Sequence, residues 1–552
     1  MNRHYTKLLV STILISFILV FTYCTIHLIF KNKNAFTLNE LLRSQLDLQN
    51  LIKTQNQIIT DLDIVKCNKL IKCNIPLGYV RLNPSLSYHQ TKGGNTNEKK
   101  KMYYSEYYLV AKLQDIREAT KFISDIVMEQ KEGYELVGNG KGGFKFYKKL
   151  ERNNIESPIM DSTKVLRSVD ILFGSNDLID LRANHKTLHF THDDSIHTIL
   201  SISLMSQDNI VEQENSVNDE KHNTKQQKEV IATRSEKYKI MQISDLHFGQ
   251  DLGNCNSKGI DCKSSDLKTL KFIDQSIKAE KPEIVVITGD LFDIKRSTDY
   301  KSILLKSLQP IIATGTKFVY TFGDESFSRE DKLTILEFLT TLPNCLNYLP
   351  IENSLHGVTN YNFKITNELN KQSIALSVLD SEDQFIDESQ INYLYRFCNN
   401  KEFFLDYKLL FFHHPLPQYR PAGIFKIIGS YNERHPLNSK TNEKYHDDIV
   451  NCSYHVVSVG HEHENDACIL SEMSKKENEA EEVDKNEKKS IWLCYSSVAG
   501  DSAITKLNQS YVRKLRMFEV DFTKKRIISW KKNENDKTAF EPQLIYQKDA
   551  GS

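Results

Sequence analysis

Five short apolar runs in the C-terminal half of the chain each end in residues that can bind a metal ion. These endings are Asp245-Leu-His247, Gly289-Asp290, Gly323-Asp324-Glu325, His413-His414-Pro415 and Gly460-His461-Glu462-His463. Imidazole and carboxylate groups suit borderline divalent ions such as Mn, Fe and Zn. Each motif alone is a weak signal, because an isolated D-x-H is more often a surface pair. Their order and placement together predict a metal centre.

The number of candidate ligands indicates two divalent ions rather than one. A pair of ions about 3.5–4 Å apart needs a shared carboxylate and several ligands each. Such a pair polarises a phosphoryl oxygen and lowers the pKa of a bridging water, which then acts as a hydroxide nucleophile at neutral pH. The motifs therefore predict hydrolysis of a phosphate ester.

Alternating strands and helices must position these residues. The expected strands are Tyr238–Ser244, Glu283–Thr288, Lys317–Phe322, Ser373–Asp380, Tyr407–Phe412, His455–Val459, Ile491–Tyr495 and Arg516–Phe522. The expected helices are Ser264–Glu280, Ser297–Ala313 and Arg329–Thr341. This alternation predicts a layered α/β domain over residues 237–540, with its polar motifs at the carboxyl ends of strands. Residues 471–490 are rich in Glu and Lys and are expected to form a disordered surface insertion.

The first half of the chain has a different character. Residues 8–30 contain no Asp, Glu, Lys or Arg and are long enough to cross a hydrocarbon core of about 30 Å. We therefore expect a single-pass membrane anchor there, and the sequence leaves its sidedness and compartment open. Residues 35–65 are expected to form a helical stalk, and residues 75–206 a mixed α+β region with a helix near residues 115–130. The polar residues 207–236 read as a linker.

Composition limits the remaining possibilities. Lys plus Arg and Asp plus Glu are both 72 in 552 residues, so no overall field predicts nucleic-acid binding. The 10 cysteines include the close pairs Cys67/Cys73 and Cys255/Cys262. These pairs are either buried or loop thiols, or disulfides of an oxidising compartment.

The order of the motifs resembles the signature of calcineurin-like metallophosphoesterases. The segments SDLHFG, KPEIVVITGDLFD, FFHHPLPQY and VSVGHEHENDAC are similar to the fungal and plant branch related to purple acid phosphatases. That resemblance implies a β-sandwich flanked by helices. It also implies that Asp245, His247 and His463 hold one ion, that His413 and His461 hold the other, and that Asp290 bridges them. His414 would be a neighbour of these ligands, for which a structural histidine is the plainer interpretation.

One motif departs from the family, which has Gly-Asn-His after the third strand. Here Gly323-Asp324-Glu325 either replaces the family residues or marks a short deletion. Asp324 could serve as an oxygen ligand, and the catalytic candidates are Asp290, Asp324, Glu325 and His414. Loss of the histidine removes a general acid worth about 10²–10⁴-fold in rate. We therefore expect a phosphatase acting on phosphorylated substrates, phosphoproteins foremost, and keep a membrane-bound pseudophosphatase with a regulatory or binding role as the alternative.

Overall fold

The structure is a computed structural model that describes most of the chain after residue 56. The described residues are 57–68, 73–87, 105–152, 164–190, 196–206, 230–253, 264–294, 299–350, 352–400, 405–473, 489–502, 511–536 and 539–548, with a few isolated positions. No helix within these ranges has the length and apolarity needed to span a membrane. Apart from isolated positions, the predicted anchor at 8–30 lies outside the described residues, as do residues 35–56 of the predicted stalk.

The C-terminal domain is built on two β-sheets. A six-stranded sheet has the order β13-β12-β11-β21-β22-β23, with strands β11 (Lys237–Ile243), β12 (Ile284–Thr288), β13 (Lys317–Thr321), β21 (Lys514–Asp521), β22 (Arg526–Asn533) and β23 (Phe540–Gln547). An eight-stranded sheet has the order β10-β14-β15-β16-β18-β20-β19-β17. Its strands are β10 (Val230–Thr233), β14 (Tyr361–Asn367), β15 (Ser373–Val378), β16 (Tyr407–Phe411), β17 (Ile427–Ile428), β18 (Val456–Val459), β19 (Cys468–Glu472) and β20 (Ser490–Tyr495).

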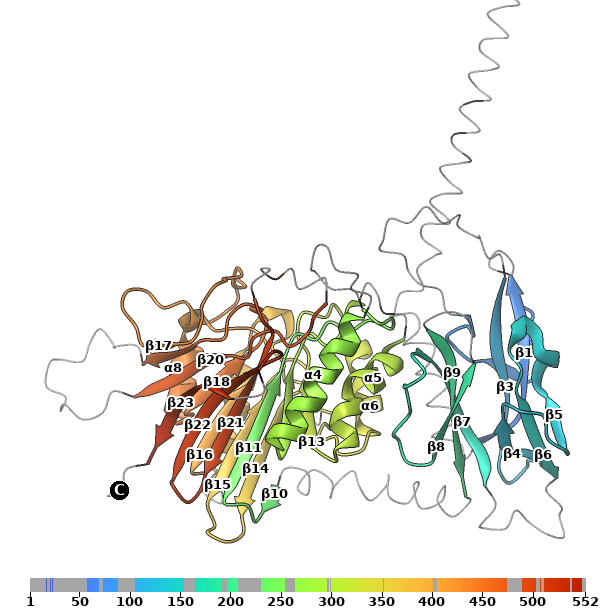
Figure 1. Ribbon diagram of the computed structural model, residues 1–552, viewed down its shortest axis with the longest axis horizontal. Coiled ribbons are helices and arrows are strands. Elements are labelled where there is room, and N and C mark those ends of the chain that lie inside the picture. The colour runs from blue at the N-terminus through green and yellow to red at the C-terminus, as the bar shows by residue number, and fades with distance from the viewer. Residues whose placement is uncertain are drawn as a thin grey trace, which may run out of the picture.

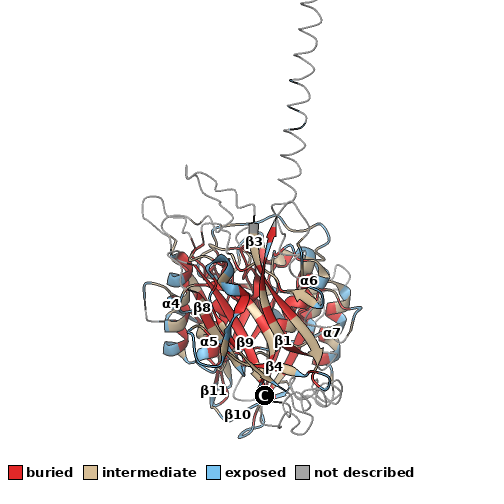
Figure 2. Ribbon diagram, turned by 90° about the vertical axis from the view of Figure 1, so that its right-hand side faces the viewer, coloured by how far each residue is buried: buried red, intermediate tan, exposed pale blue. Residues whose placement is uncertain are grey.

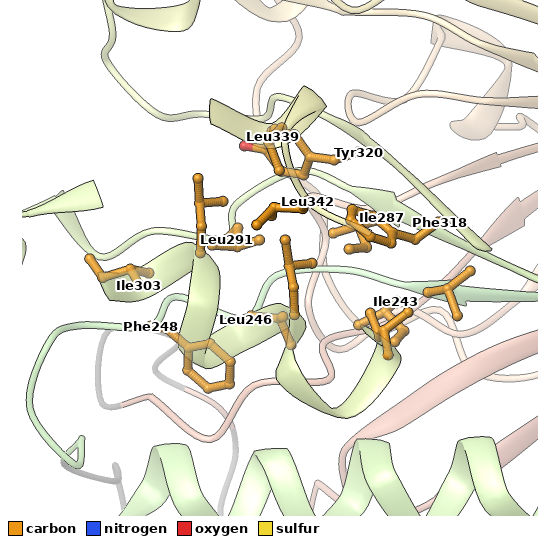
Figure 3. Packing of buried hydrophobic residues seen from close by; sticks show 14 of the residues in the cluster. Ile243, Leu246, Phe248, Ile287, Leu291, Ile303, Phe318, Tyr320, Leu339 and Leu342 are labelled. Atoms are coloured by element: carbon orange, nitrogen blue, oxygen red, sulfur yellow. The ribbon is translucent and has the colours of Figure 1, made fainter. Parts of the chain in front are cut away.

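Helices cover the outer face of each sheet, so the domain has four layers (Figure 1). Side chains alternate along β11: Ile240 faces the core between the sheets, whereas Met241 packs under the helices. Helices α4 (Ser265–Glu280), α5 (Tyr300–Ala313) and α6 (Arg329–Thr340) cover the six-stranded sheet, and Figure 3 shows part of that packing. Helices α7 (Glu388–Cys398) and α8 (Lys444–Asn451) pack on the eight-stranded sheet. The predicted β-sandwich flanked by helices is confirmed.

Every strand and helix predicted for this domain from apolar runs is present, with ends shifted by a few residues at most. Strands β11, β12 and β13 pair in parallel, as do β15, β16 and β18. Parallel pairing brings the carboxyl ends of neighbouring strands to one edge of each sheet. The predicted insertion at 471–490 begins and ends in strands β19 and β20, and residues 474–488 lie outside the described residues.

The N-terminal region is a module of three similar three-stranded sheets, whose first strands contact one another. Each sheet has its strands in the order first, third, second: β1-β3-β2, β4-β6-β5 and β7-β9-β8. The strands are β1 (Gln57–Asn68), β2 (Tyr79–Arg81), β3 (Ser105–Asp115), β4 (Lys121–Val127), β5 (Tyr134–Leu136), β6 (Tyr147–Arg152), β7 (Val165–Gly174), β8 (His185–Phe190) and β9 (His197–Met205). Figure 2 looks onto this module from outside and colours many residues of its strands as buried.

Four predictions for the N-terminal half were wrong, in whole or in part. Residues 57–65 of the expected stalk lie in β1, and residues 121–127 of the expected helix near 115–130 lie in β4. The described part of the 75–206 region contains no α-helix, so it is a β-module rather than a mixed α+β region. Residues 230–233 of the expected linker form β10, which pairs with β14. Leucine and isoleucine at short spacings fit a strand of period two as well as a helix, and tertiary pairing decided between them.

The module docks on the helical layer of the C-terminal domain, where β7 contacts α5. Lys301 Nζ lies 2.5 Å from Asp170 Oδ1, and the backbone N–H of Phe173 donates to Ser302 Oγ over 2.8 Å. Arg182 stacks its guanidinium 4.7 Å above the ring of Phe338. Module and domain therefore share one hydrophobic core cluster.

For one of the two close cysteine pairs, the structure shows whether the thiols are free or form a disulfide. Cys67 is bonded to Cys73, and further disulfides join Cys398 to Cys452 and Cys468 to Cys494. Cys345 takes part in none of these three disulfides, and the Cys255/Cys262 pair lies outside the described residues.

Candidate metal centre

The predicted ligands meet where the carboxyl ends of strands from both sheets come together. Asp245, Asp290 and Asp324 follow β11, β12 and β13 of one sheet. His413 and His461 follow β16 and β18 of the other. Side chains far apart in sequence are thereby gathered at one end of the sandwich.

Several of these residues adopt a backbone conformation that non-glycine residues rarely take. Asp245, His247, Asp290 and His461 have φ angles of 58°, 48°, 51° and 69°. Left-handed conformations cost free energy and persist where the surrounding structure enforces them, which is typical of functional sites. The strand-end turns therefore fix the directions of these four side chains.

Two glycines allow the turns after β12 and β13 to approach each other. A Cβ atom on Gly289 would lie 2.6 Å from His413 Nδ1 and 2.7 Å from Gly323 Cα. A Cβ atom on Gly323 would lie 2.5 Å from Asp290 Oδ1. Any larger residue at either position would push the candidate ligands apart.

Asp245, His247, Asp290 and His463 form the first cluster, with donor atoms that all lie within 4.8 Å of one another. His247 Nε2 lies 3.5 Å from Asp290 Oδ2 and 3.5 Å from His463 Nε2. His463 Nε2 is 3.4 Å from Asp245 Oδ1. Two carboxylates and two imidazoles are a donor set that fits Mn, Fe or Zn.

Asp324, His413, His414 and His461 form the second cluster, again with donor atoms within 4.8 Å of one another. Asp324 Oδ1 lies 2.8 Å from His414 Nε2, and Asp324 Oδ2 lies 3.1 Å from His461 Nδ1. Asp324 therefore does point into the site, although its motif departs from the family. Asp290 lies between the clusters, because its Oδ1 is 3.6 Å from His413 Nε2.

His413 offers a specific sign that the second cluster fits a cation. Its Nδ1 is 2.7 Å from the carbonyl of Thr288, so Nδ1 carries the proton and Nε2 presents a lone pair. That Nε2 is fully buried and has no hydrogen-bond partner among the described residues. A buried polar atom without a partner costs free energy unless another group, such as a metal ion, binds it.

The protonation states suit metal binding. Burial lowers the pKa of His247 and of His414 to about 3, so both imidazoles are neutral at pH 7. Burial raises the pKa of Asp290 well above its usual range, and the carboxylates of Glu325, Asp245 and Asp324 add to this effect. Burial opposes ionisation of Asp324, but hydrogen bonds from His414 and His461 lower its pKa well below the usual range. Crowded carboxylates raise each other's energy, and a cation would relieve that repulsion.

Glu325 does not join either cluster. Its carboxylate accepts hydrogen bonds from the backbone N–H groups of Leu291 and Gly323 and from the Tyr320 hydroxyl, at 2.7, 2.6 and 3.1 Å. The side chain is buried and ties the turn after β13 to the turn after β12. Its geometry is that of a residue that positions the neighbouring turns.

The loop of residues 430–438, which carries none of the predicted site residues, lies against the site. His435 places its ring 4.9 Å from that of His461, and its Nε2 is 3.4 Å from Glu433 Oε1. Glu433 also accepts a hydrogen bond from the backbone N–H of His463. The charged residues of ERHP at 433–436 were the only signal in the sequence, and nothing in their spacing predicts this approach.

A polar pocket of about 500 Å³ opens beside the second cluster. It is lined by Gly323, Asp324, Glu325, Ser326, Lys332, Glu382, Asp383, Gln384, His414, Asn438 and Lys440. Every described residue that lines it is polar, charged or glycine. Gln384 Nε2 donates to Asp324 Oδ1 over 3.0 Å, which connects the pocket wall to the cluster.

Comparison with known proteins agrees with this geometry. Residues 238–465 match the calcineurin-like phosphoesterase family. The chain is 33% identical over 303 residues to protein SIA1 of Kluyveromyces lactis, covering 54% of this chain and 49% of that protein. It is 30% identical over 345 residues to phosphatase DCR2 of Saccharomyces cerevisiae, covering 56% of each chain.

A plant relative carries a different description. The chain is 25% identical over 354 residues to the probable inactive purple acid phosphatase 29 of Arabidopsis thaliana, covering 56% of this chain and 82% of that one. The chain spans about half the length of the two yeast relatives that it matches.

Proposed function

We propose that this chain, which carries a calcineurin-like phosphoesterase domain over residues 238–465, is a metal-dependent phosphatase of phosphomonoesters. The observation that carries the proposal is the pair of adjacent carboxylate–imidazole clusters, with Asp290 between them. Asp245, His247, Asp290 and His463 would hold one ion, and Asp324, His413 and His461 the other. Bound divalent ions supply Lewis acidity toward a phosphoryl oxygen and lower the pKa of water.

The chain's own residues set the conditions for this reaction. The left-handed turns hold Asp245, His247, Asp290 and His461 in fixed directions, so little reorganisation is needed when substrate binds. Glu325 holds the turns of Asp290 and Asp324 together through backbone hydrogen bonds. Arg420 donates to Glu462, and both anchor the loop that carries His435.

The pocket beside the second cluster indicates the class of leaving group. An aryl or alkyl leaving group would displace water from these polar and charged side chains and could not replace the lost hydrogen bonds. A hydroxyl-bearing leaving group can replace those water contacts with hydrogen bonds. Phosphoseryl peptides and polyol phosphates therefore fit this pocket better than aryl phosphates do, and hydrolysis of a phosphate ester accords with the name of the yeast phosphatase relative.

The test is phosphate release by the full-length chain loaded with Mn, Fe or Zn. A phosphoseryl peptide, glycerol phosphate and an aryl phosphate would be compared, with Asp290→Asn as the control. We expect release from the hydrophilic esters, and a fall of at least about 10³-fold in Asp290→Asn because Asp290 lies between both clusters. A wild-type chain that binds no metal would refute the proposal.

A pseudophosphatase is the second candidate, and a specific observation favours it. The third strand lacks the family's histidine, and the plant relative is described as probably inactive. On this alternative the chain binds metal and phosphorylated ligands without turnover. Bound metal together with no release from any of the three esters would establish it.

The disulfides support a proposal about location. Three disulfides among the described residues favour folding in an oxidising compartment. Together with the predicted anchor at 8–30, they support a location of the phosphoesterase domain on the lumenal or outer side of a membrane. Thiol labelling of the protein in cells, before and after reduction, tests this proposal, because an intracellular reducing location would leave these cysteines open to labelling.

A further inference from the structure

Three imidazoles converge on the carboxylate of Asp324. The ring of His414 lies 4.6 Å from that of His413 and 4.7 Å from that of His461, measured between centroids. His414 Nε2 and His461 Nδ1 face opposite oxygens of Asp324. The partnerless Nε2 of His413 belongs to the same group of donor atoms.

His414 is oriented as a metal ligand would be. Ser381 Oγ lies 2.8 Å from His414 Nδ1 and also accepts the backbone N–H of His414 over 3.1 Å. With Nδ1 held by a neighbour, Nε2 is the nitrogen that faces the cluster. Histidines that bind metals are commonly oriented in this way, through a hydrogen bond to the other ring nitrogen.

An ion bound at the second cluster would need a further ligand, because Asp290 contributes less to this cluster than to the first. Asp290 Oδ1, which lies 3.6 Å from His413 Nε2 of the second cluster, also accepts the backbone N–H of Asp324 over 2.5 Å. Asp290 Oδ2 is turned toward His247 of the first cluster. Asp290 therefore offers a donor oxygen more directly to the first cluster than to the second. An ion in the second cluster would need another donor atom, and His414 Nε2 lies in position to supply it.

We propose that His414 is a ligand of the second ion, which is then held by three imidazoles and the Asp324 carboxylate. This inference rests on the proposed function, because it presumes that the clusters bind metal. A set of three nitrogens and one carboxylate favours Zn²⁺ or Co²⁺ over Mg²⁺ and Ca²⁺, which prefer oxygen ligands. The second site is therefore a histidine-rich site selective for borderline ions.

The experiment measures metal content and affinity rather than turnover. The full-length chain is loaded with Co²⁺ or Zn²⁺, dialysed against a competing chelator, and assayed for bound metal by elemental analysis and for its Co²⁺ visible spectrum. The variants are His414→Ala, His414→Phe, which fills the space without a donor nitrogen, and Ser381→Ala, which removes only the orienting hydroxyl. His446→Ala is the matched control, since His446 is also buried and hydrogen-bonded through Nδ1, to Asp447 at 2.8 Å, and lies in neither cluster.

Loss of an outer partner typically costs about 10–100-fold in metal affinity, and Ser381→Ala should fall in that range. We expect both His414 variants to lose more than about 100-fold in metal affinity at the second site. Their Co²⁺ spectrum should change, and the first ion should be retained. The proposal is overturned if the His414 variants keep both ions, or if they lose no more affinity than Ser381→Ala does. A wild-type chain without metal would overturn the proposed function itself, which is a distinguishable result.

Discussion

At the scale of single residues, the charge of Asp324 distinguishes this site from a family that has asparagine at the matching place. The carboxylate lies within 3.1 Å of ring nitrogens of two histidines. We predict that Asp324→Asn lowers the affinity for the second ion by at least about tenfold, or about 1.4 kcal/mol, because the amide keeps an oxygen ligand but loses the charge. Chelator competition measures this change, and the first ion serves as the internal reference. An equal loss of affinity for both ions would contradict the assignment of Asp324 to the second cluster alone.

The buried imidazoles make the metal-free protein sensitive to acid. Burial lowers the pKa of His247 and His414 from 6.5 to about 3. Between these values the unfolded chain binds protons that the folded chain excludes, so stability decreases as pH falls below 6.5. We predict that the Tm of the metal-free chain drops by several degrees from about pH 7.5 to about pH 5, because one pKa unit corresponds to about 1.4 kcal/mol.

The variant His414→Phe provides the control for this prediction. Because it removes one of the rings whose pKa is lowered by burial, its Tm should depend less on pH than that of the wild type over the same range. Asp290 acts in the opposite sense, since its raised pKa stabilises the fold at low pH and loses that effect as pH rises. The comparison between wild type and variant cancels this contribution. An identical pH dependence in both proteins would contradict the assignment to His414.

The sequence predicted most of the site residues for a physical reason. Strand ends carry the functional groups of layered α/β folds, so Asp245, Asp290 and His461 could be placed from apolar runs and the polar residues that follow them. The direction of Glu325 could not be placed, because it depends on backbone N–H groups of another turn. The same holds for His414, whose orientation is set by Ser381 at the end of a neighbouring strand.

At the scale of elements, a buried carboxylate holds the loop of residues 430–438 against the metal centre. Glu462 is fully buried and accepts hydrogen bonds from Arg420, from the backbone N–H of His435 and from Asn465, at 2.7, 2.8 and 2.7 Å. We predict that Glu462→Ala lowers the free energy of unfolding by about 3–5 kcal/mol, because it leaves the largely buried charge of Arg420 without its partner. Urea denaturation measures the change.

An exposed pair gives the contrast that this prediction needs. Arg234 and Glu368 lie 2.6 Å apart with side chains that are 81% and 44% exposed. Glu368→Ala should lower the free energy of unfolding far less than Glu462→Ala does, since solvent screens the exposed pair. Similar losses in Glu462→Ala and Glu368→Ala would show that burial of the Glu462 network does not stabilise the loop.

Strands and helices could be predicted where the apolar pattern of the sequence matches the way the element packs. They were missed where pairing with a distant strand decides the conformation. Strand β12 is an almost wholly apolar run, as is typical of a parallel strand that is covered on both faces. Strand β1 alternates Asp61, Leu62, Asp63 and Ile64, a period-two pattern that competes with the helical spacing of its apolar residues. The repeated Asp-Ile-Val, Asp-Ile-Val and Asp-Ile-Leu at 63–65, 125–127 and 170–172 was the signal that could have revealed the three similar sheets.

At the scale of the whole molecule, the N-terminal module completes the helical layer of the phosphoesterase domain. Leu172, Leu178 and Ile199 of the module belong to the same hydrophobic cluster as residues of α5 and α6. The buried Lys301 of α5 is paired with Asp170 of the module. Local pattern could not predict this docking, because each partner's surface alone reads as an ordinary amphipathic face.

Removal of the module tests whether the two parts form one folding unit. We predict that a fragment of residues 230–552 has a Tm several degrees below that of residues 57–552 and self-associates, because its α5–α6 face exposes apolar surface and Lys301 loses its partner. Both fragments lack residues 1–56, so the comparison isolates the module. Thermal unfolding and light scattering provide the measurement. Equal Tm values and monomeric behaviour of both fragments would mean that the phosphoesterase domain folds independently, and that the module must have been retained for a reason other than stability.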